Sequence, residues 1–328
     1  MRALLCTQFG RFDRLEVVDI PSPRPGSRQT RINIKAASVS FPDALTVQGL
    51  YQTRPSLPFI PGTEFAGVVG EVGDSVTEFE VGDRVVAFGL GGLAEEALAD
   101  AARTIILPEG MEFDIGAGFI VSYGTALHGL RDCAHLATGE TLLVLAAAGG
   151  AGHAALEIGL AMGARVIAAA SSDAKLAFCL QLGATSVINY STEDLRNRIK
   201  ILTEGRGVDV VYDPVGGPYT EQALRATAWN GRLLVIGFAA GEIAKIPLNH
   251  CLLNERSVIG VYFGESVKHD PTRHSANVEQ LLEWFACGKI KPHISARVPL
   301  SLAAQLMARI ARREISGKAI VLPEAGQR

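Results

Sequence analysis

The segment over residues 141–170 constrains the fold more than any other part of the chain. It contains an apolar run, a glycine-rich turn, a helical run and a second apolar run, over residues 141–147, 147–152, 154–162 and 165–170. Glycines allow a sharp turn and a close approach of the backbone to a pyrophosphate, while the first N–H groups and the dipole of the following helix attract phosphates. This order of elements predicts a dinucleotide-binding fold.

The predicted phosphate-binding residues of this turn are Gly149, Gly150, Ala151 and Gly152. Ala147 stands at the first glycine position of the G-x-G-x-x-G pattern. Its methyl group leaves slightly less room at the turn, a variation that we interpret as typical of NADP-binding proteins.

Length and texture predict two domains, because 328 residues exceed one ordinary core. Residues 1–120 are rich in turns and prolines and are expected to form a catalytic, partly open antiparallel barrel, with strands near 17–20, 30–36, 65–72 and 83–87. Residues 263–328 are expected to return to this domain, with helices near 277–287 and 302–312 and a strand near 318–322.

Residues 121–262 alternate apolar strands with helices, which predicts an α/β fold with a doubly wound parallel sheet covered on both faces. Beyond the segment described above, the expected strands lie near 186–188, 208–212, 232–237 and 257–262. The expected helices lie near 173–182, 192–202 and 219–226.

The end of the second apolar run indicates which cofactor this fold binds. An NAD site needs a carboxylate there to bond both ribose hydroxyls, but Ser171 and Ser172 follow the strand instead. Lys175 lies in the first turn of the next helix, where its charge opposes the helix dipole; with the hydroxyls it suits a 2′-phosphate. Asp173 is expected to cap that helix, with a ribose contact as the alternative. The pattern therefore predicts NADPH.

Charge and hydropathy limit the partners. The net charge is −3, so no strong field selects nucleic acid. The longest apolar runs are far shorter than a membrane span, and the N-terminus lacks the apolar region of a signal peptide, so we expect a cytoplasmic protein. The five cysteines are scattered and form no C-x-x-C motif, so neither a disulfide framework nor a structural zinc site is expected.

Seven segments spread over nearly the whole chain form a specific set. They are LPFIPGTEFAGVV (57–69), VGDRV (81–85), AAAGGAG (146–152), GATSVINY (183–190), GVDVVYDPVGG (207–217), GRLLVIGFAAG (231–241) and GKAIV (317–321). Together they resemble the zinc-free quinone oxidoreductase (zeta-crystallin-like) branch of the medium-chain dehydrogenase/reductase superfamily. The resemblance implies a Rossmann domain inserted into a GroES-like catalytic domain, with the nicotinamide in the cleft.

The same resemblance implies roles for individual side chains. The 2′-phosphate would be met by Ser171, Lys175 and Tyr190. Thr125 would approach the nicotinamide and the diphosphate, and Asp213 would have a structural role. The remaining implied cofactor contacts are Phe41, Val215, Phe238, Ala239, Gly241 and, more weakly, Lys318.

Zinc-dependent relatives use a cysteine, a G-H-E motif and a further cysteine or acid, and these positions differ here. Ser40 stands at the first, Thr63 replaces the histidine, and Ser122 offers no thiolate. Zinc needs three or four suitable ligands, so no metal site is expected. His128, Cys133 and His135 are close in sequence but are not expected to bind a metal.

Without a metal, the expected hydride acceptor is a quinone or another conjugated carbonyl, in which negative charge delocalises. The family's asparagine and tyrosine are replaced by Ser40 and Leu45, while Asp43 is retained. The candidate catalytic residues are Ser40, Asp43 and Tyr51. Tyr51 is expected to line the substrate or to pack as an aromatic; Asp43 is expected to be a structural hydrogen-bond acceptor or, as the alternative, a general base.

Two other functions remain open at this point. One is reduction of the carbon–carbon double bond of an enoyl or acryloyl thioester or a 2-alkenal. The other is an NADPH-binding structural or nucleic-acid-binding role, which the intact turn and the small net charge disfavour. The expected partners are a small-molecule substrate and, from the resemblance, a second copy of the chain, for which residues 257–263 could supply a sheet edge.

Overall fold

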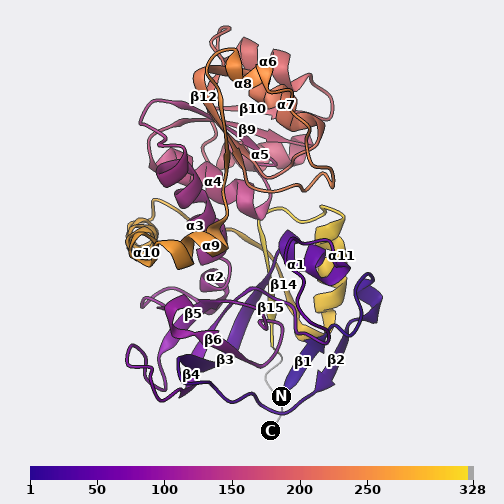
Figure 1. Ribbon diagram of the computed structural model, residues 1–328, viewed down its shortest axis with the longest axis vertical. Helices are drawn as coiled ribbons and strands as arrows, with labels where there is room; N and C mark the ends of the chain where they lie inside the picture. Colours follow the sequence, from indigo (N-terminus) through magenta and orange to yellow (C-terminus); the bar gives the residue numbers. More distant parts are fainter. Residues whose placement is uncertain (324–328) are drawn as a thin grey trace. The chain divides into compact units, whose positions relative to one another are not determined.

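A computed structural model describes residues 1–323, which divide into two units. The β-rich unit comprises residues up to 121 and from 292 onward, and the α/β unit comprises residues 122–291. In Figure 1, the C-terminal elements (yellow) lie among the N-terminal ones (indigo to purple) in the β-rich unit.

The β-rich unit is built on a largely antiparallel sheet with the strand order β14-β15-β3-β4-β5-β7, in which β6 pairs with β3 and only β14–β15 is parallel. The strands are β3 (Gln29–Val39), β4 (Glu64–Val72), β5 (Arg84–Phe88), β6 (Glu96–Asp100), β7 (Thr104–Ile106), β14 (Ile294–Pro299) and β15 (Lys318–Leu322), beside a separate pair β1 (Arg2–Leu5) and β2 (Glu16–Asp19). The antiparallel domain predicted from turns and prolines is confirmed.

The C-terminal segment completes this sheet. Strand β15 pairs with β3, so that Ile320 lies opposite Ser38, and helix α11 (Ala303–Ala311) contacts α1 (Phe41–Gln48). Apolar side chains from both ends of the chain share one core, including Ile32, Phe65, Val85, Leu306 and Met307. The remaining helical turns of the unit are η1 (Phe12–Arg14), η2 (Ala101–Arg103), α2 (Phe113–Gly116) and η4 (Leu300–Leu302).

The α/β unit contains a parallel sheet with the strand order β10-β9-β8-β11-β12-β13. The strands are β8 (Thr141–Leu145), β9 (Arg165–Ala170), β10 (Ser186–Asn189), β11 (Val208–Asp213), β12 (Thr227–Val235) and β13 (Ser257–Gly260). Numbered within the sheet, this is the order 3-2-1-4-5-6 of a dinucleotide-binding fold, which reverses between β8 and β11. The predicted doubly wound sheet is confirmed.

Helices cover both faces of this sheet (Figure 1). They are α4 (Gly150–Ala161), α5 (Asp173–Gln181), α6 (Leu195–Leu202), α7 (Pro218–Arg225) and the short α8 (Asn249–Leu252). Leu143 belongs to the cluster that α6 and α7 cover, and Leu142 points at α4 on the other face, next to Gly159. Every residue of β8 is buried, which explains why its sequence is a continuous apolar run.

The chain leaves the α/β unit later than expected. Residues 263–291 belong to this unit and include α9 (Phe263–His269) and α10 (Pro271–Ala286), so the return begins at residue 292 and not at 263. Long-range contacts hold this segment. The Asn277 side chain donates to Asp132 at 2.8 Å, and the backbone N–H of Lys291 donates to buried Glu157 at 3.1 Å. Asp132 lies in the π-helix η3 (His128–Cys133), which follows α3 (Ile120–Leu127).

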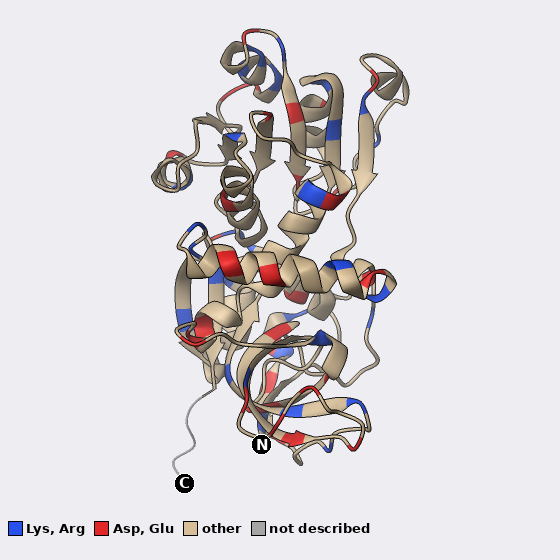
Figure 2. Ribbon diagram, turned by 90° about the vertical axis from the view of Figure 1, so that its left-hand side faces the viewer, with Lys and Arg blue, Asp and Glu red and all other residues tan. Residues whose placement is uncertain are grey.

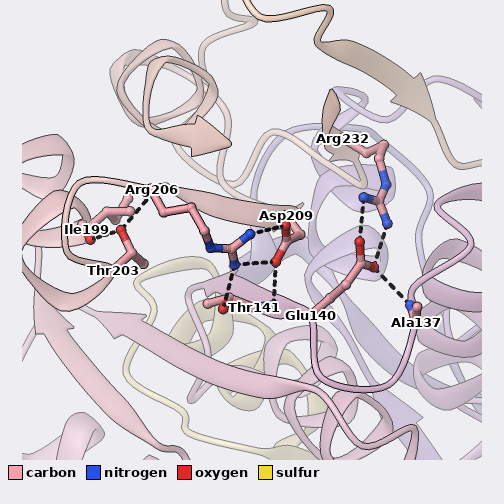
Figure 3. A network of polar contacts seen from close by, with 9 residues as sticks. Ala137, Glu140, Thr141, Ile199, Thr203, Arg206, Asp209 and Arg232 are labelled. Carbon is pink, nitrogen blue, oxygen red and sulfur yellow. Dashed lines mark hydrogen bonds and ion pairs between the residues drawn. The ribbon is translucent and has the colours of Figure 1, made fainter. Parts of the chain in front are cut away.

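Ion pairs close the amino-terminal edge of the parallel sheet (Figure 3). Arg206 binds both carboxylate oxygens of Asp209 at 2.7 Å, and Asp209 also accepts the N–H of Thr141 at the start of β8. Arg232 binds Glu140 through two hydrogen bonds of 2.9 and 2.7 Å. The strands β8, β11 and β12 are therefore joined at this edge by side chains as well as by the ladder.

Within residues 1–323, no helix combines the length and the apolar character needed to cross a bilayer.

Candidate functional site

The turn after β8 has the geometry predicted from its glycines. The N–H of Gly149 bonds to the carbonyl of Ala146 at 2.9 Å, and α4 begins at Gly150. A Cβ on Gly152 would lie 2.2 Å from the carbonyl oxygen of Ala146, so only glycine allows the helix to pack this close. Among the residues described, no side chain caps this helix, so its first N–H groups can serve a phosphate.

Ala147, the departure from the glycine pattern, is fully buried, and its N–H bonds to the carbonyl of Ala169. This bond continues the contact of β8 with β9 beyond Leu145, in a place where a methyl group fits the core.

The structure brings together the side chains of Ser171 and Lys175, and places the backbone of Tyr190 beside the end of the same strand. Lys175 Nζ lies 3.3 Å from Ser171 Oγ, and the backbone N–H of Tyr190 donates to the carbonyl of Ala170 at 3.2 Å. The hydroxyl of Ser191 donates to the carbonyl of Ser171, which ties the ends of β9 and β10 to each other. The ring of Tyr190 packs on that of Tyr219 with 4.7 Å between centroids.

Ser172 and Asp173, at the start of α5, have different hydrogen-bonding roles. Ser172 is the N-cap residue of α5 and is half-buried, without a side-chain bond to its helix. Asp173, expected to be the cap, instead accepts a 2.7 Å hydrogen bond from the side chain of Asn189. Asn189 in turn accepts the N–H of Ser191, so Asp173 orders the loop after β10. The prediction of a capping role was therefore wrong, because a long-range partner competes for the carboxylate.

The loops after β11 and β12 are hydrogen-bonded to each other at the same sheet edge. Asp213 is buried and accepts the N–H groups of Val215 and Gly216 and the hydroxyl of Thr220, which agrees with the structural role expected for it. Burial raises the pKa of Asp213 and these hydrogen bonds oppose the shift. The N–H of Ala239 bonds to the carbonyl of Pro214, so the expected contacts Val215, Phe238, Ala239 and Gly241 lie on two connected loops.

Thr125 lies on α3 of the α/β unit and is half-buried. A helix was expected before His128, but its bounds were not predicted, since the apolar and small residues over 117–130 show neither a clear start signal nor a clear stop signal.

In the β-rich unit, two of the three expected catalytic residues, Ser40 and Asp43, lie at the start of α1. Ser40 is the N-cap residue, and both its N–H and its hydroxyl donate to Asp43 Oδ2, at 2.7 and 2.5 Å. Asp43 is 1% exposed, and burial raises its pKa while the bonds from Ser40 oppose the shift. This geometry supports the acceptor role of Asp43 and gives Ser40 a fixed partner. Phe41 is the first residue of the helix, and Tyr51 follows its end; both are half-buried.

A buried ion pair lies in the same unit. Lys318 on β15, 4% exposed, lies 3.3 Å from Glu64 on β4, 1% exposed. Glu64 also accepts the hydroxyl of Ser38 and the N–H of Val121. The ammonium of Lys318 is thus held by a carboxylate of its own unit, and the weak expectation of a cofactor contact there finds no support. The pairing depends on two strands far apart in sequence, and the only signal for it is a charged residue at the start of each apolar run.

The residues at the zinc positions of related enzymes do not fit zinc. Ser40 donates its hydroxyl proton to Asp43, and Glu64 is bonded to three groups of the protein. Within residues 1–323, no group of three or more His, Cys, Asp or Glu side chains has an arrangement that could hold a metal ion. Zinc requires three or four ligands such as thiolate sulfur, imidazole nitrogen or carboxylate oxygen. Of the residues at the zinc positions, only Glu64 has such a side chain.

Comparisons with known proteins cover both units. Residues 26–109 match the family described as alcohol dehydrogenase GroES-like domain, and residues 150–286 match that described as zinc-binding dehydrogenase. The quinone oxidoreductase-like protein 2 homolog of Nematostella vectensis is 38% identical over 98% of this chain and 88% of its own length.

Two solved structures show the same arrangement of elements. The quinone oxidoreductase of Pseudomonas syringae pv. tomato has a TM-score of 0.92 and 32% identity, and the comparison covers 98% of this chain and 99% of that one. The quinone oxidoreductase of Escherichia coli, crystallised in complex with NADPH, has a TM-score of 0.93 and 28% identity, over 98% and 100% of the two chains.

Proposed function

The chain belongs to the quinone oxidoreductase branch of the medium-chain dehydrogenase/reductase superfamily, and from this premise we propose that it is a zinc-independent, NADPH-dependent reductase of quinones or related conjugated carbonyl compounds. The observation that carries the proposal is the group formed by Ser171, Lys175 and Tyr190 beyond β9 and β10, beside the glycine turn after β8. The NADPH complex of the similar E. coli enzyme supports the same cofactor.

Within this proposal, each part of the α/β unit has a distinct task. The start of α4 holds the diphosphate through backbone N–H groups, and Gly152 permits the close packing that places them there. Lys175 supplies a positive charge to the 2′-phosphate, with the hydroxyls of Ser171 and Tyr190 as hydrogen-bond donors. The connected loops at 215 and 238–241 support the nicotinamide ribose. Bound NADPH would supply the hydride.

The β-rich unit constrains which side chain can assist the acceptor. Ser40 donates its only hydroxyl proton to Asp43, so it serves mainly to begin α1. Tyr51, at the end of this helix, is therefore the side chain that we propose as the hydrogen-bond donor to the substrate carbonyl. A conjugated acceptor suits such a site, since its negative charge delocalises and needs less stabilisation than an isolated carbonyl would.

Turnover assays test the proposal directly. The protein is mixed with NADPH and, in separate reactions, 1,2-naphthoquinone, a 2-alkenal and an enoyl-CoA, while the absorbance of the reduced cofactor is followed. We expect the quinone to be reduced fastest. Tight NADPH binding without turnover of any of the three would contradict an enzymatic role, and preference for enoyl-CoA would assign thioester reduction instead.

Two further measurements separate the parts of the proposal. Metal analysis of active protein should find no stoichiometric zinc, and a chelator should leave the rate unchanged. Tyr51→Phe should lower the rate with the quinone about tenfold while leaving NADPH binding unchanged. An equal rate would remove Tyr51 from the mechanism without touching the cofactor assignment.

We also propose a homodimer formed along β13, the edge strand of the parallel sheet. Exposed apolar side chains cluster in sequence around this strand, at Leu248, Leu252, Leu253, Val258 and Tyr262. An unpaired apolar edge favours association. Sedimentation analysis should give twice the chain mass, and Val258→Lys should shift the protein toward the monomer.

A further inference from the structure

The π-helix η3 brings a cysteine and a histidine into contact. In a π-helix the backbone bonds span five residues, as in the bond from the Ala134 N–H to the Gly129 carbonyl, so side chains five apart lie on one face. Cys133 is five residues after His128, and its Sγ lies 3.5 Å from the Nε2 atom of that ring. The other ring nitrogen, Nδ1, lies 3.1 Å from Asp132 Oδ2. A regular α-helix would not align these side chains.

Asp132 makes the histidine of this group a cation. Its carboxylate is fixed by the side chains of Asn277 at 2.8 Å and Arg131 at 3.1 Å. The hydrogen bond that the His128 ring donates to Asp132, followed by its contact with Cys133, raises the pKa of His128 to about 9. At neutral pH both ring nitrogens therefore carry protons, one donated to Asp132 and one directed at the Cys133 sulfur. The Nε2 atom lies within hydrogen-bond distance of the sulfur, so the ring can pass a proton to a group that the sulfur attacks.

A small hollow adjoins His128, on the side of the ring formed by α9 and α10. Its volume is about 150 Å³, and it is lined by His128 together with Ser266, His269, Arg273 and Asn277 from α9 and α10. Figure 1 shows these two helices close to α3, in agreement with the bond between Asn277 and Asp132. Asn277 is 3% exposed, and its Oδ1 is buried without a hydrogen-bond partner among residues 1–323. A polar ligand group could meet this oxygen.

We propose that Cys133, with His128 and Asp132, is a reactive thiol site that adds covalently to α,β-unsaturated carbonyl compounds. The sulfur lone pair forms a bond to the β-carbon, and the carbon–carbon π pair moves to the enolate. The Nε2 proton of His128 then passes to the enolate, which leaves a thioether and a neutral imidazole. The net change is addition of S–H across the double bond, and it consumes no oxidant or cofactor. The proposal is independent of hydride transfer from NADPH.

The five cysteines allow an internal test on the full chain. N-ethylmaleimide, an unsaturated imide, is the probe, and the rate at each cysteine is measured at pH 7 by peptide mass spectrometry. Cys287 is exposed and its sulfur bonds only weakly, to the carbonyl of Trp284, whereas Cys133 is half-buried. Accessibility alone predicts that Cys287 reacts first. We expect Cys133 to react at least tenfold faster; the reverse order would overturn the proposal.

Variants assign the effect to the ring. His128→Asn should lower the rate at Cys133 about tenfold and leave the rate at Cys287 unchanged, and Asp132→Asn should act in the same direction. His135→Asn is the matched control, because His135 is exposed, two residues beyond Cys133, and has a left-handed φ of 50° that asparagine tolerates. Equal rates in the His128 and His135 variants would refute the role of the imidazolium. Cys133→Ser should abolish this adduct and keep NADPH-dependent turnover.

The pH profile separates a charged ring from a merely structural one. The other charged or titratable groups around the site are Arg131 on the same element, Arg232 of β12, whose Nε donates to the Ala134 carbonyl, and His269, Asp270, Arg273 and His274 on α9 and α10. Since His128 is protonated below about pH 9, the ratio of the rates at Cys133 and Cys287 should be high from pH 6 to 8 and should fall above pH 9. A ratio that does not change with pH would contradict the mechanism.

Discussion

The two ends of the strands in the parallel sheet, which we call its amino-terminal and carboxyl-terminal edges, are ordered by different interactions. At the amino-terminal edge, charged side chains bind each other: Arg206 with Asp209, and Arg232 with Glu140 (Figure 3). At the carboxyl-terminal edge, the carboxylates of Asp213 and Asp173 accept hydrogen bonds from uncharged donors, namely backbone N–H groups, a hydroxyl and a side-chain amide, and form no ion pair in the bonds described above. At the amino-terminal ends of the strands, the charged side chains therefore stabilise the fold by pairing with each other. At the carboxyl-terminal ends, backbone N–H groups and Lys175 lie where we propose that the dinucleotide binds.

Outside these two edges, basic and acidic residues are not separated into different regions of the molecule. In the ribbon view of Figure 2, basic and acidic segments are interspersed along both units. This agrees with the net charge of −3 and gives no support for a nucleic-acid-binding face. The difference between the two edges therefore depends on a few residues at each, and single substitutions can test it.

The largest effect is expected at the glycine turn. In Gly152→Ala, the new Cβ would lie 2.2 Å from a backbone oxygen, so the turn must shift, at a cost of about 3 kcal/mol. We expect a lower unfolding midpoint and at least a hundredfold weaker NADPH binding, measured by chemical denaturation and by calorimetry.

Gly149→Ala is the matched control for this turn. Its Cβ would approach no atom closer than 3.4 Å, and its φ of −79° suits alanine. It should retain wild-type stability. A stable Gly152→Ala variant with normal NADPH affinity would show that the close approach of α4 to the turn does not matter.

At the amino-terminal edge, Asp209→Asn should change stability and leave binding alone. Loss of the bidentate pair with Arg206 and of a charged acceptor for Thr141 should cost about 2 kcal/mol, discounted because Arg206 is half-exposed. Asp13→Asn, which disrupts the exposed pair with Arg11, should leave the unfolding free energy almost unchanged. A changed NADPH affinity in Asp209→Asn would mean that the two edges are coupled.

The smallest expected effect is a change with pH in the stability that Asp209 contributes. Burial acts to raise the pKa of Asp209, but the bonds from Arg206 and Thr141 outweigh it, so its pKa lies below the ordinary 3.8. A carboxyl group whose pKa is lower in the folded state stabilises the fold at pH values above its unfolded-state pKa. This stabilisation is lost as the pH falls through the folded-state pKa. The difference in unfolding free energy between wild type and Asp209→Asn should thus be constant from pH 7 to 5 and narrow below about pH 4. A difference that widens in acid would contradict the assignment.

The parts of the fold that the sequence predicts are those determined locally. The bounds expected for β9 and β15 match the structure, since both strands are short apolar runs with clear limits. The glycine turn follows from the same local pattern, whereas the order of the strands within the sheet was not predicted. Among the site residues, Ser171 and Lys175 were assigned from their places at the end of β9 and the start of α5, whereas Tyr190 was assigned from the family resemblance alone.

What was missed depends on partners that are distant in sequence. Helix α1 contains Pro42 in its first turn and is only eight residues long, so its periodicity is weak; the capping box of Ser40 and Asp43 is its one local signal. The end of the α/β unit at residue 291 depends on Asn277 meeting Asp132, 145 positions away. The partner of Asp173 is likewise set by the neighbouring strand and not by its own helix.

The most direct test of the account is a pair of titrations, NADPH and NADH, on wild type and Lys175→Ala, with affinity measured by calorimetry. We predict that wild type binds NADPH at least tenfold more tightly than NADH. Lys175→Ala should lose about tenfold in NADPH affinity, or about 1.4 kcal/mol, and almost nothing with NADH, because only NADPH carries the 2′-phosphate. Equal losses for both cofactors, or a wild type that prefers NADH, would contradict the assignment of this edge as a 2′-phosphate site.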